Sequence, residues 1–132
     1  MPRLIVTGKR IVSPESVEQC IVAAWLDYHS VIWNHIPNGG LRAWSTAVEL
    51  KRCGVKRGFP DNVIWTPPPA HHAAIGCVFE LKREKGGKLS DEQRWWLQTL
   101  TELKWHTFVA RGAGDAIRQL KLLGYGKTGM GG

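Results

Sequence analysis

The sequence is poor in cysteine, and its three cysteines are far apart. Cys20, Cys53 and Cys77 form no C-x-x-C pair. A disulfide framework in a small secreted domain uses an even number of cysteines, and a structural zinc site uses closely spaced ones. Neither is indicated here. The apolar residues beside Cys20 and Cys77 instead predict core thiols in a reducing compartment.

Long hydrophobic runs are also missing. No stretch approaches the roughly 20 apolar residues of a membrane-spanning helix. The opening residues 1–7 are too short to form the apolar region of a secretory signal peptide. We therefore expect an intracellular, cytoplasmic protein with no membrane partner.

Acidic residues are few relative to basic ones. The chain has 18 Lys and Arg against 11 Asp and Glu, which gives a net charge of +7 and a pI near 9.7. This balance favours polyanions through phosphate contacts, although many basic proteins bind no nucleic acid. The 132 residues, 43% of them hydrophobic, suffice for one domain with its own core. We expect that domain over residues 1–123 and a flexible Gly-rich tail over 124–132.

Two β-prone runs, 58–65 and 76–82, form the centre of the sequence. Turn-forming residues separate them, so they predict a hairpin. Asp61 opens the first strand, and Glu80 and Lys82 share one face of the second because side chains alternate along a strand. Pairing of Asp61 with Glu80 or Lys82 would place all three on that face, whereas a one-residue slip would turn Asp61 away.

These three side chains predict a metal site. Two carboxylates that converge at a strand end, with no second base or nucleophile in reach, offer the hard oxygen ligands that suit Mg²⁺ or Mn²⁺. Lys82 beside them would steady a phosphate or a hydroxide.

The rest of the chain alternates between helical and extended patterns. Besides the hairpin, we expect helices over 14–29, 43–53, 90–103 and 115–123, and strands over 31–36 and 105–110. Ser13 is the expected N-cap of the first helix, with Pro14 as its first residue. The expected core stripe of that helix comprises Val17, Cys20, Ile21, Ala24 and Tyr28.

Three motifs in this order resemble a known family. They are Gly58-Phe59-Pro60-Asp61, Glu80-Leu81-Lys82 and Leu89-Ser90-x-x-Gln93. The order and spacing are similar to the PD-(D/E)XK nuclease superfamily, and more narrowly to the virus-type replication-repair nuclease (VRR-NUC) family. Weaker matches at Ser13-Pro14-Glu15 with Gln19, at 36–40 and at 54–58 extend the resemblance over roughly residues 13 to 123.

The resemblance implies a fold and an activity. The expected fold class is α/β, a mixed sheet flanked by helices with a restriction-endonuclease-like αβββαβ core and the 43–53 helix as an insertion. The implied activity is hydrolysis of DNA phosphodiester bonds by an endonuclease that uses Mg²⁺ or Mn²⁺. Small stand-alone members resemble Holliday-junction resolvases, so the implied partners are branched or junction DNA and a second copy of the chain.

The resemblance also implies roles for individual residues. Asp61, Glu80 and the backbone carbonyl of Leu81 would hold the metal, and Lys82 would be catalytic. Glu15 would join the site as a catalytic acid and further ligand. On residue chemistry alone, an acid there complements the helix dipole, and Glu18 is the rival one turn later.

Gln93 and four DNA-binding candidates each have a simpler interpretation. Ser90-x-x-Gln93 is a capping-box pattern, and we expect the Gln93 amide to serve either the cap or the catalytic site, but not both at once. Turn chemistry and solvated charge equally explain the implied DNA-contacting residues, which are Asn38, Arg42, Lys56 and Arg57.

Alternative functions remain open. Within the same chemistry, the chain would be a flap-directed or nonspecific nicking nuclease. From another class, it would be a nonenzymatic, basic nucleic-acid-binding module in which Asp61, Glu80 and Lys82 form a structural ion pair. A third alternative is an interaction domain whose tryptophans, such as Trp25 and Trp95, form the contact surface.

Overall fold

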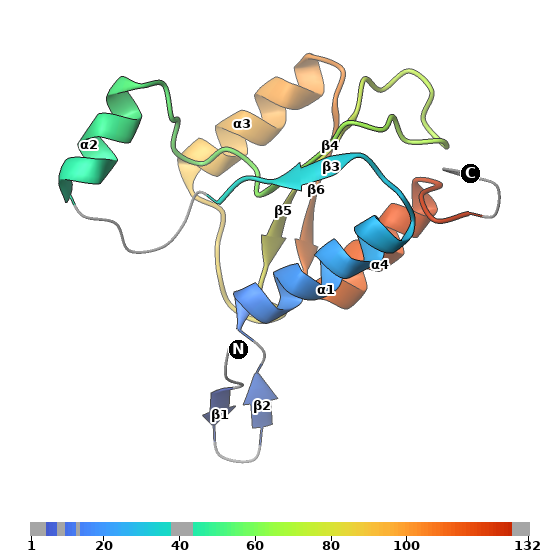
Figure 1. Ribbon diagram of the computed structural model, residues 1–132, viewed down its shortest axis with the longest axis horizontal. Coiled ribbons are helices and arrows are strands. Elements are labelled where there is room, and N and C mark those ends of the chain that lie inside the picture. Colours follow the sequence, from blue (N-terminus) through green and yellow to red (C-terminus); the bar gives the residue numbers. More distant parts are fainter. Residues whose placement is uncertain (1–4, 8–9, 13, 38–43, 128–132) are drawn as a thin grey trace.

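The computed structural model describes residues 5–7, 10–12, 14–37 and 44–127. Figure 1 shows how the elements are arranged. In chain order they are β1 (Ile5–Thr7), β2 (Arg10–Val12), α1 (Glu15–Tyr28), β3 (Trp33–His35), α2 (Trp44–Arg52), β4 (Asn62–Ile64), β5 (Cys77–Lys82), α3 (Asp91–Glu102), β6 (His106–Arg111) and α4 (Ala113–Leu122).

The core of the fold is a four-stranded mixed sheet in the order β3-β4-β5-β6. The β3–β4 and β4–β5 pairs are antiparallel, and the β5–β6 pair is parallel. A parallel pair needs a crossover connection, which α3 supplies. One core cluster joins α1 and α4 to one face of the sheet, and a second joins α3 to the other. The expected α/β class, with helices flanking a mixed sheet, is confirmed.

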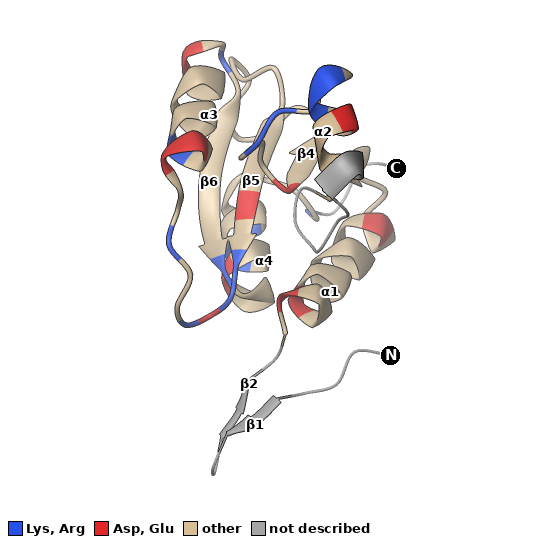
Figure 2. Ribbon diagram, turned by 90° about the vertical axis from the view of Figure 1, so that its left-hand side faces the viewer, with Lys and Arg blue, Asp and Glu red and all other residues tan. Residues whose placement is uncertain are grey.

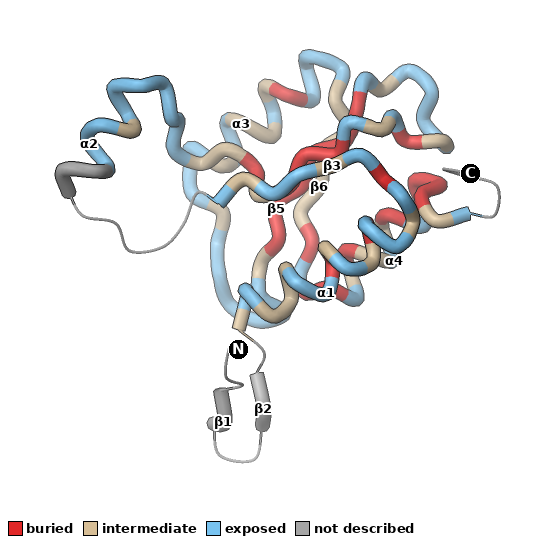
Figure 3. Tube along the Cα trace, in the orientation of Figure 1, coloured by how far each residue is buried: buried red, intermediate tan, exposed pale blue. Residues whose placement is uncertain are grey.

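The central strand β5 is buried on both faces (Figure 3). Phe79 and Leu81 pack in the cluster with α1 and α4, whereas Val78 packs in the cluster with α3. Because side chains alternate, Glu80 lies on the α3 face with Val78. Glu80 is only 4% exposed, so a carboxylate occupies a position where an apolar residue would otherwise pack.

The register of the hairpin places Asp61 beside Glu80. Asn62 pairs with Phe79 and Val63 with Val78. Continuing this register by one residue puts Asp61 opposite Glu80, on the α3 face. The first strand of the hairpin, β4, is shorter than expected and comprises only Asn62–Ile64.

Helix α1 matches its predicted range, but its predicted core stripe is wrong. Val22 and Leu26 are buried, whereas Ile21 is 47% and Tyr28 83% exposed. Cys20 and Ala24 are exposed as well. Both sides of this helix are apolar, so hydrophobicity does not decide which one is buried. Two polar contacts decide it instead: the Gln19 side chain bonds β4, and the Glu18 side chain bonds the start of α4.

The predicted burial of the cysteines and the predicted N-cap of α1 also need correction. Cys20 and Cys53 are exposed, and only Cys77 is buried among the three. Pro14 occupies the N-cap position of α1 rather than its first helical position. The expected cap, Ser13, lies outside the described residues.

Three segments differ from the predicted elements. The β1–β2 hairpin was not expected. Helix α4 begins at Ala113, before the predicted start, because Gly112 takes the N-cap position with a φ of 88°. The chain beyond Leu122 was expected to be loose from Gly124, but Tyr125 is fully buried and its hydroxyl donates to the Thr66 carbonyl at 2.6 Å.

Helix α2 lies close to its predicted range and stands away from the sheet (Figure 1). It lies between β3 and β4 in the chain, as expected of an insertion in the αβββαβ core. Within the described ranges, no helix has the length and apolar character needed to cross a membrane.

Candidate active site

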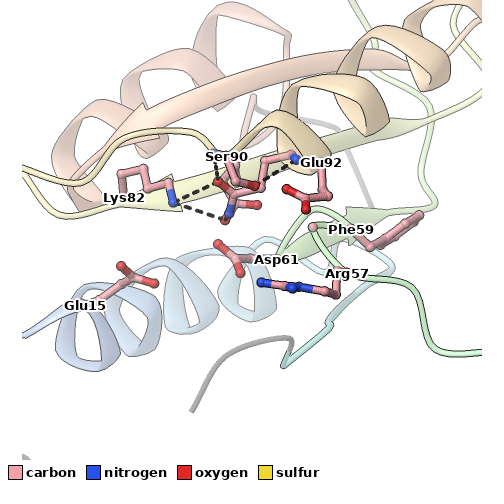
Figure 4. A pocket seen from close by; sticks show the side chains of 10 residues that line it. Glu15, Arg57, Phe59, Asp61, Lys82, Ser90 and Glu92 are labelled. Carbon is pink, nitrogen blue, oxygen red and sulfur yellow. Dashed lines mark hydrogen bonds and ion pairs between the residues drawn. The ribbon is translucent and has the colours of Figure 1, made fainter. Parts of the chain in front are cut away.

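A cavity of about 330 Å³ opens where β4 begins and β5 ends. Figure 4 shows Glu15, Asp61 and Lys82 directed toward this space, with Arg57 approaching from another side. The lining residues are Glu15, Arg57, Gly58, Phe59, Asp61, Glu80, Lys82, Ser90, Glu92 and Gln93. The structure therefore brings together every side chain that the sequence placed in the catalytic group.

The backbone of Asp61 is held from both sides. Its carbonyl accepts hydrogen bonds from the Ile36 N–H at 2.6 Å and from His35 Nδ1 at 2.8 Å. Its carboxylate Oδ2 accepts the Leu81 N–H at 3.0 Å. These bonds hold Asp61 against β5 and restrict the rotamers of its side chain. The carboxylate of Asp61 is therefore held close to Glu80.

The residue after Asp61 anchors this corner to α1. Asn62 is fully buried. Its amide exchanges two hydrogen bonds with Gln19, at 2.8 and 3.1 Å. Buried amides that satisfy each other hold a single orientation, so Gln19 positions β4, and through it Asp61, rather than entering the cavity.

Glu80 has one satisfied oxygen and one that is not. Oε1 accepts from Gln93 Nε2 at 2.9 Å and lies 3.9 Å from Lys82 Nζ. Oε2 is buried and meets no N–H donor among the described residues, and the neighbouring Asp61 carboxyl shares a hydrogen bond with Glu80 only when one of the two acids is protonated. Burial, and then the nearby Asp61 carboxylate, raise the pKa of Glu80 to about 9. At neutral pH, with no cation bound, Glu80 therefore holds a proton.

The Gln93 amide bonds the cap of α3 and two candidate site residues at once. Its Oε1 accepts from the Ser90 N–H at 2.8 Å, while Ser90 Oγ accepts from the Gln93 N–H at 3.1 Å, which completes the capping box. The same Oε1 accepts from Lys82 Nζ at 3.2 Å, and Nε2 donates to Glu80. The expectation that one amide could serve only one role is wrong, because its oxygen and nitrogen face different partners.

These donors fit a hard divalent cation. An orphaned buried carboxylate oxygen beside a second carboxylate is the arrangement that such a cation neutralises. Among the residues that the structure describes, no three His, Cys, Asp or Glu side chains gather closely enough to hold a metal by themselves. The protein ligands would then be Asp61 and Glu80, completed by backbone carbonyl and water oxygens.

The two rival acids of α1 occupy different places. Glu15 lines the cavity, and burial followed by the charge of Asp61 raises its pKa. Glu18 Oε2 instead accepts the Ala113 N–H at 2.7 Å, at the start of α4. Glu15 is thus the α1 acid that faces Asp61, whereas Glu18 satisfies an otherwise unpaired donor of a helix end.

Cations lie on both segments that flank the cavity (Figure 2). Arg57 lines the cavity, and Lys56 is exposed beside it. The connection after β5 carries Arg83, Lys85 and Lys88, which are exposed as well. The other two DNA-binding candidates, Asn38 and Arg42, lie outside the described residues.

Phe59 and Glu92 also line the cavity, although neither was predicted as a site residue. They reach it because Gly58 lets the preceding loop touch α3: a Cβ at Gly58 would lie 2.7 Å from Glu92 Cβ and 2.8 Å from the Gln93 nitrogen. Gly58 also has a φ of 80°, which favours glycine. The glycine of the Gly-x-Pro-Asp motif was the available signal for this contact.

Comparison with known proteins places this arrangement in a family. The VRR-NUC domain family model matches residues 9–114. The chain belongs to the VRR-NUC family. The VRR-NUC domain is a nuclease domain of the PD-(D/E)XK type, a type that generally uses divalent metal ions, and DNA is the implied substrate.

A solved structure shares the VRR-NUC fold. A protein described as a VRR_NUC domain protein aligns with a TM-score of 0.67 and 23% sequence identity, over 83% of this chain and 86% of that one. A search of curated proteins finds no match.

Proposed function

We propose that this VRR-NUC protein is an Mg²⁺- or Mn²⁺-dependent endonuclease that cuts branched DNA as a homodimer. The observation that supports this most is the pair of acids at the cavity: Glu80 is buried, its Oε2 meets no N–H donor among the described residues, and the Asp61 carboxyl lies beside Glu80. A purely structural ion pair would satisfy that oxygen. A metal site leaves it free for the ion.

Asp61, Glu80 and the Leu81 carbonyl are the proposed metal ligands. A divalent cation bound there stabilises charge on the reacting phosphate and lowers the pKa of an attacking water. Asp61 and Glu80 contribute by being preorganised: the Leu81 N–H holds one carboxylate and Gln93 holds the other. Glu15, on the Asp61 side of the cavity, is proposed to orient water or to assist in ion binding.

Lys82 is the proposed catalytic cation. Gln93 Oε1 and Glu80 Oε1 hold its Nζ at 3.2 and 3.9 Å. From this position the ammonium orients the attacking water and stabilises a non-bridging phosphate oxygen. Gln93 therefore acts on the reaction indirectly, by holding the side chains of Glu80 and Lys82 in fixed positions relative to each other.

Arg57 and Lys56 are proposed to hold the substrate backbone on one side of the cavity. Arg57 lines the cavity itself, so its guanidinium can pair with a phosphate next to the one being cut. Asn38 and Arg42 remain proposed DNA contacts from the resemblance alone.

The apolar stripe on the outer side of α1, exposed at Ile21, Ala24 and Tyr28 and half-buried at Val17, supports a homodimer. The spacing of the residues in this stripe is the same in both directions along the helix. They are Val17, Ile21, Ala24 and Tyr28. In an antiparallel pair of α1 helices, Val17 meets Tyr28 of the second copy and Ile21 meets Ala24, so that small side chains face large ones. At about 1.5 Å of rise per residue, the two Glu15 residues would lie about 22 Å apart along such a pair. Two sites so spaced suit two strands of one branched substrate.

The deciding experiment is cleavage of a panel of four-way junctions, flaps and linear duplexes in Mg²⁺, Mn²⁺ and EDTA. The proposal expects metal-dependent cutting that favours junctions, and cutting by Lys82→Ala that is slower by about 10²-fold or more. Preference for flaps, or equal cutting of all substrates, would support a flap-directed or nonspecific nicking enzyme instead. DNA binding that is equal in EDTA and in metal, with no cutting, would show a nonenzymatic binding module.

A further inference from the structure

A row of aromatic rings leads out of the cavity. The ring of Phe59 is directed away from Asp61 (Figure 4). It meets Trp96 edge to face, with ring centroids 5.0 Å apart, and Trp96 meets Trp95 in the same way at 5.0 Å. Trp95, at the end of the row, is 58% exposed.

The inner rings of this row have structural roles. Phe59 and Trp96 pack against the buried cluster between the sheet and α3. Trp96 Nε1 also donates to the Arg57 carbonyl at 3.0 Å, which ties the loop that carries Arg57 to α3. Trp95 adds an exposed aromatic face to this rigid base, and an indole face is a good stacking surface.

Charge divides the surroundings of the row into two sides. Arg57 and Lys56 lie on the loop before Asp61, and they favour a phosphate backbone. The first turn of α3 carries Asp91 and Glu92, both exposed. Arg94 lies 3.6 Å from Asp91 and offsets its charge, so Glu92, which lines the cavity, is the carboxylate that repels phosphate there. A DNA strand that enters the cavity would therefore run its backbone past Arg57 and turn its base toward α3.

We propose that Trp95 is the stacking platform for an unpaired nucleobase next to the phosphate in the cavity. This inference rests on the proposed function and names its substrate class. A base inside a continuous duplex is already stacked between its neighbours, so it can reach Trp95 only after unstacking at an energetic cost. Bases at a branch point or a frayed end avoid most of that cost. Trp95 thus makes the enzyme prefer cut sites with unpaired nucleotides beside them.

The experiment compares Trp95→Ala with two other variants. Trp95→Phe keeps a stacking face. Trp65→Ala removes a tryptophan of similar exposure, 53%, that packs edge to face on Trp105 at the opposite end of the β4–β5 hairpin. One measurement is the affinity for a short single-stranded oligonucleotide in EDTA, and the other is the ratio of cutting rates for a duplex with a splayed end and the same duplex fully paired.

The expected result is specific to Trp95. Trp95→Ala should weaken single-strand binding about tenfold or more, given the usual contribution of a base on an aromatic ring. It should also bring the cutting ratio close to one, while Trp95→Phe retains most of both properties and Trp65→Ala matches the wild type.

Two results would overturn the inference. One is that Trp95→Ala and Trp65→Ala behave alike in both measurements. The other is that Trp95→Ala converts a dimer to a monomer in sedimentation, which would make this face a subunit contact. If the wild type cuts no DNA, the proposed nuclease function fails, but the EDTA binding measurement still decides whether Trp95 stacks a base.

Discussion

Replacing Glu80 with Gln should stabilise the metal-free protein while abolishing its activity. Glu80 is 4% exposed, and its pKa is raised from an ordinary 4.5 to about 9 by burial and by Asp61. At pH 7 the folded state therefore takes up a proton that the unfolded state lacks. An amide has the shape of the protonated acid and avoids that cost.

The magnitude follows from linkage. Neutralising Glu80 at pH 7 costs about 1.4 kcal/mol for each of about 2.5 pH units, or about 3 kcal/mol. Rearrangement of the Asp61 and Lys82 side chains in the wild type offsets part of this cost. We therefore expect Glu80→Gln to raise the free energy of unfolding by about 1 to 3 kcal/mol. Because the folded-state pKa is the higher one, the stability that neutral Glu80 provides is complete below pH 4.5 and is lost as the pH rises toward 9. The advantage of the variant should therefore grow between pH 5 and pH 8.

The assay is urea unfolding in EDTA at several pH values, repeated with millimolar Mg²⁺ or Mn²⁺. The metal should stabilise the wild type by mass action and leave Glu80→Gln nearly unchanged. Glu49→Gln, an exposed carboxylate on α2, is the matched control and should change stability by less than about 0.5 kcal/mol. A variant less stable than the wild type at pH 7 in EDTA, or a difference that does not vary with pH, would refute the reasoning.

Three further predictions test other parts of the site. Lys82→Ala should slow DNA cleavage by about 10²- to 10⁴-fold with unchanged binding to an oligonucleotide, and a wild-type rate would remove Lys82 from the mechanism. Glu18→Ala should lower stability by about 1 kcal/mol in urea unfolding, because the Ala113 N–H loses its acceptor, whereas Glu15→Ala should lower activity at nearly constant stability; the reverse pattern would exchange their roles. Tyr28→Lys should give a monomer in sedimentation, and a persistent dimer would exclude the α1 stripe as the interface.

Local patterns were sufficient to predict the strands of the sheet and the end of the hairpin at which its acids lie, whereas the mixed sheet itself was implied by the family resemblance. Alternation along β5 placed Glu80 and Lys82 on one face, and the turn between the two runs brought Asp61 to the same end. Both are properties of nearby residues, so a sequence alone contains them. The capping box at Ser90 and Gln93 is equally local.

The orientation of α1 could not be predicted in the same way. Val22 and Leu26 compete with Ile21 and Tyr28 for the core, and hydrophobicity alone does not choose between the two sides. The choice is made by contacts between residues far apart in sequence, Gln19 with Asn62 across 43 positions and Glu18 with Ala113 across 95. The same holds for Tyr125, whose hydroxyl bonds the Thr66 carbonyl across 59 positions.

The site is built from groups that oppose the stability of the fold. Glu80 occupies an apolar position in the central strand, and its Oε2 meets no N–H donor there. Gln93 cannot relieve this, because its amide is already shared among Ser90, Lys82 and Glu80 Oε1. At neutral pH a proton on Glu80 gives partial relief, and a divalent cation in the cavity that Glu80 and Asp61 both line would replace that proton. Glu80 lowers the stability of the metal-free protein, and a bound cation would restore that stability. A role in ion binding therefore explains this residue better than a role in folding.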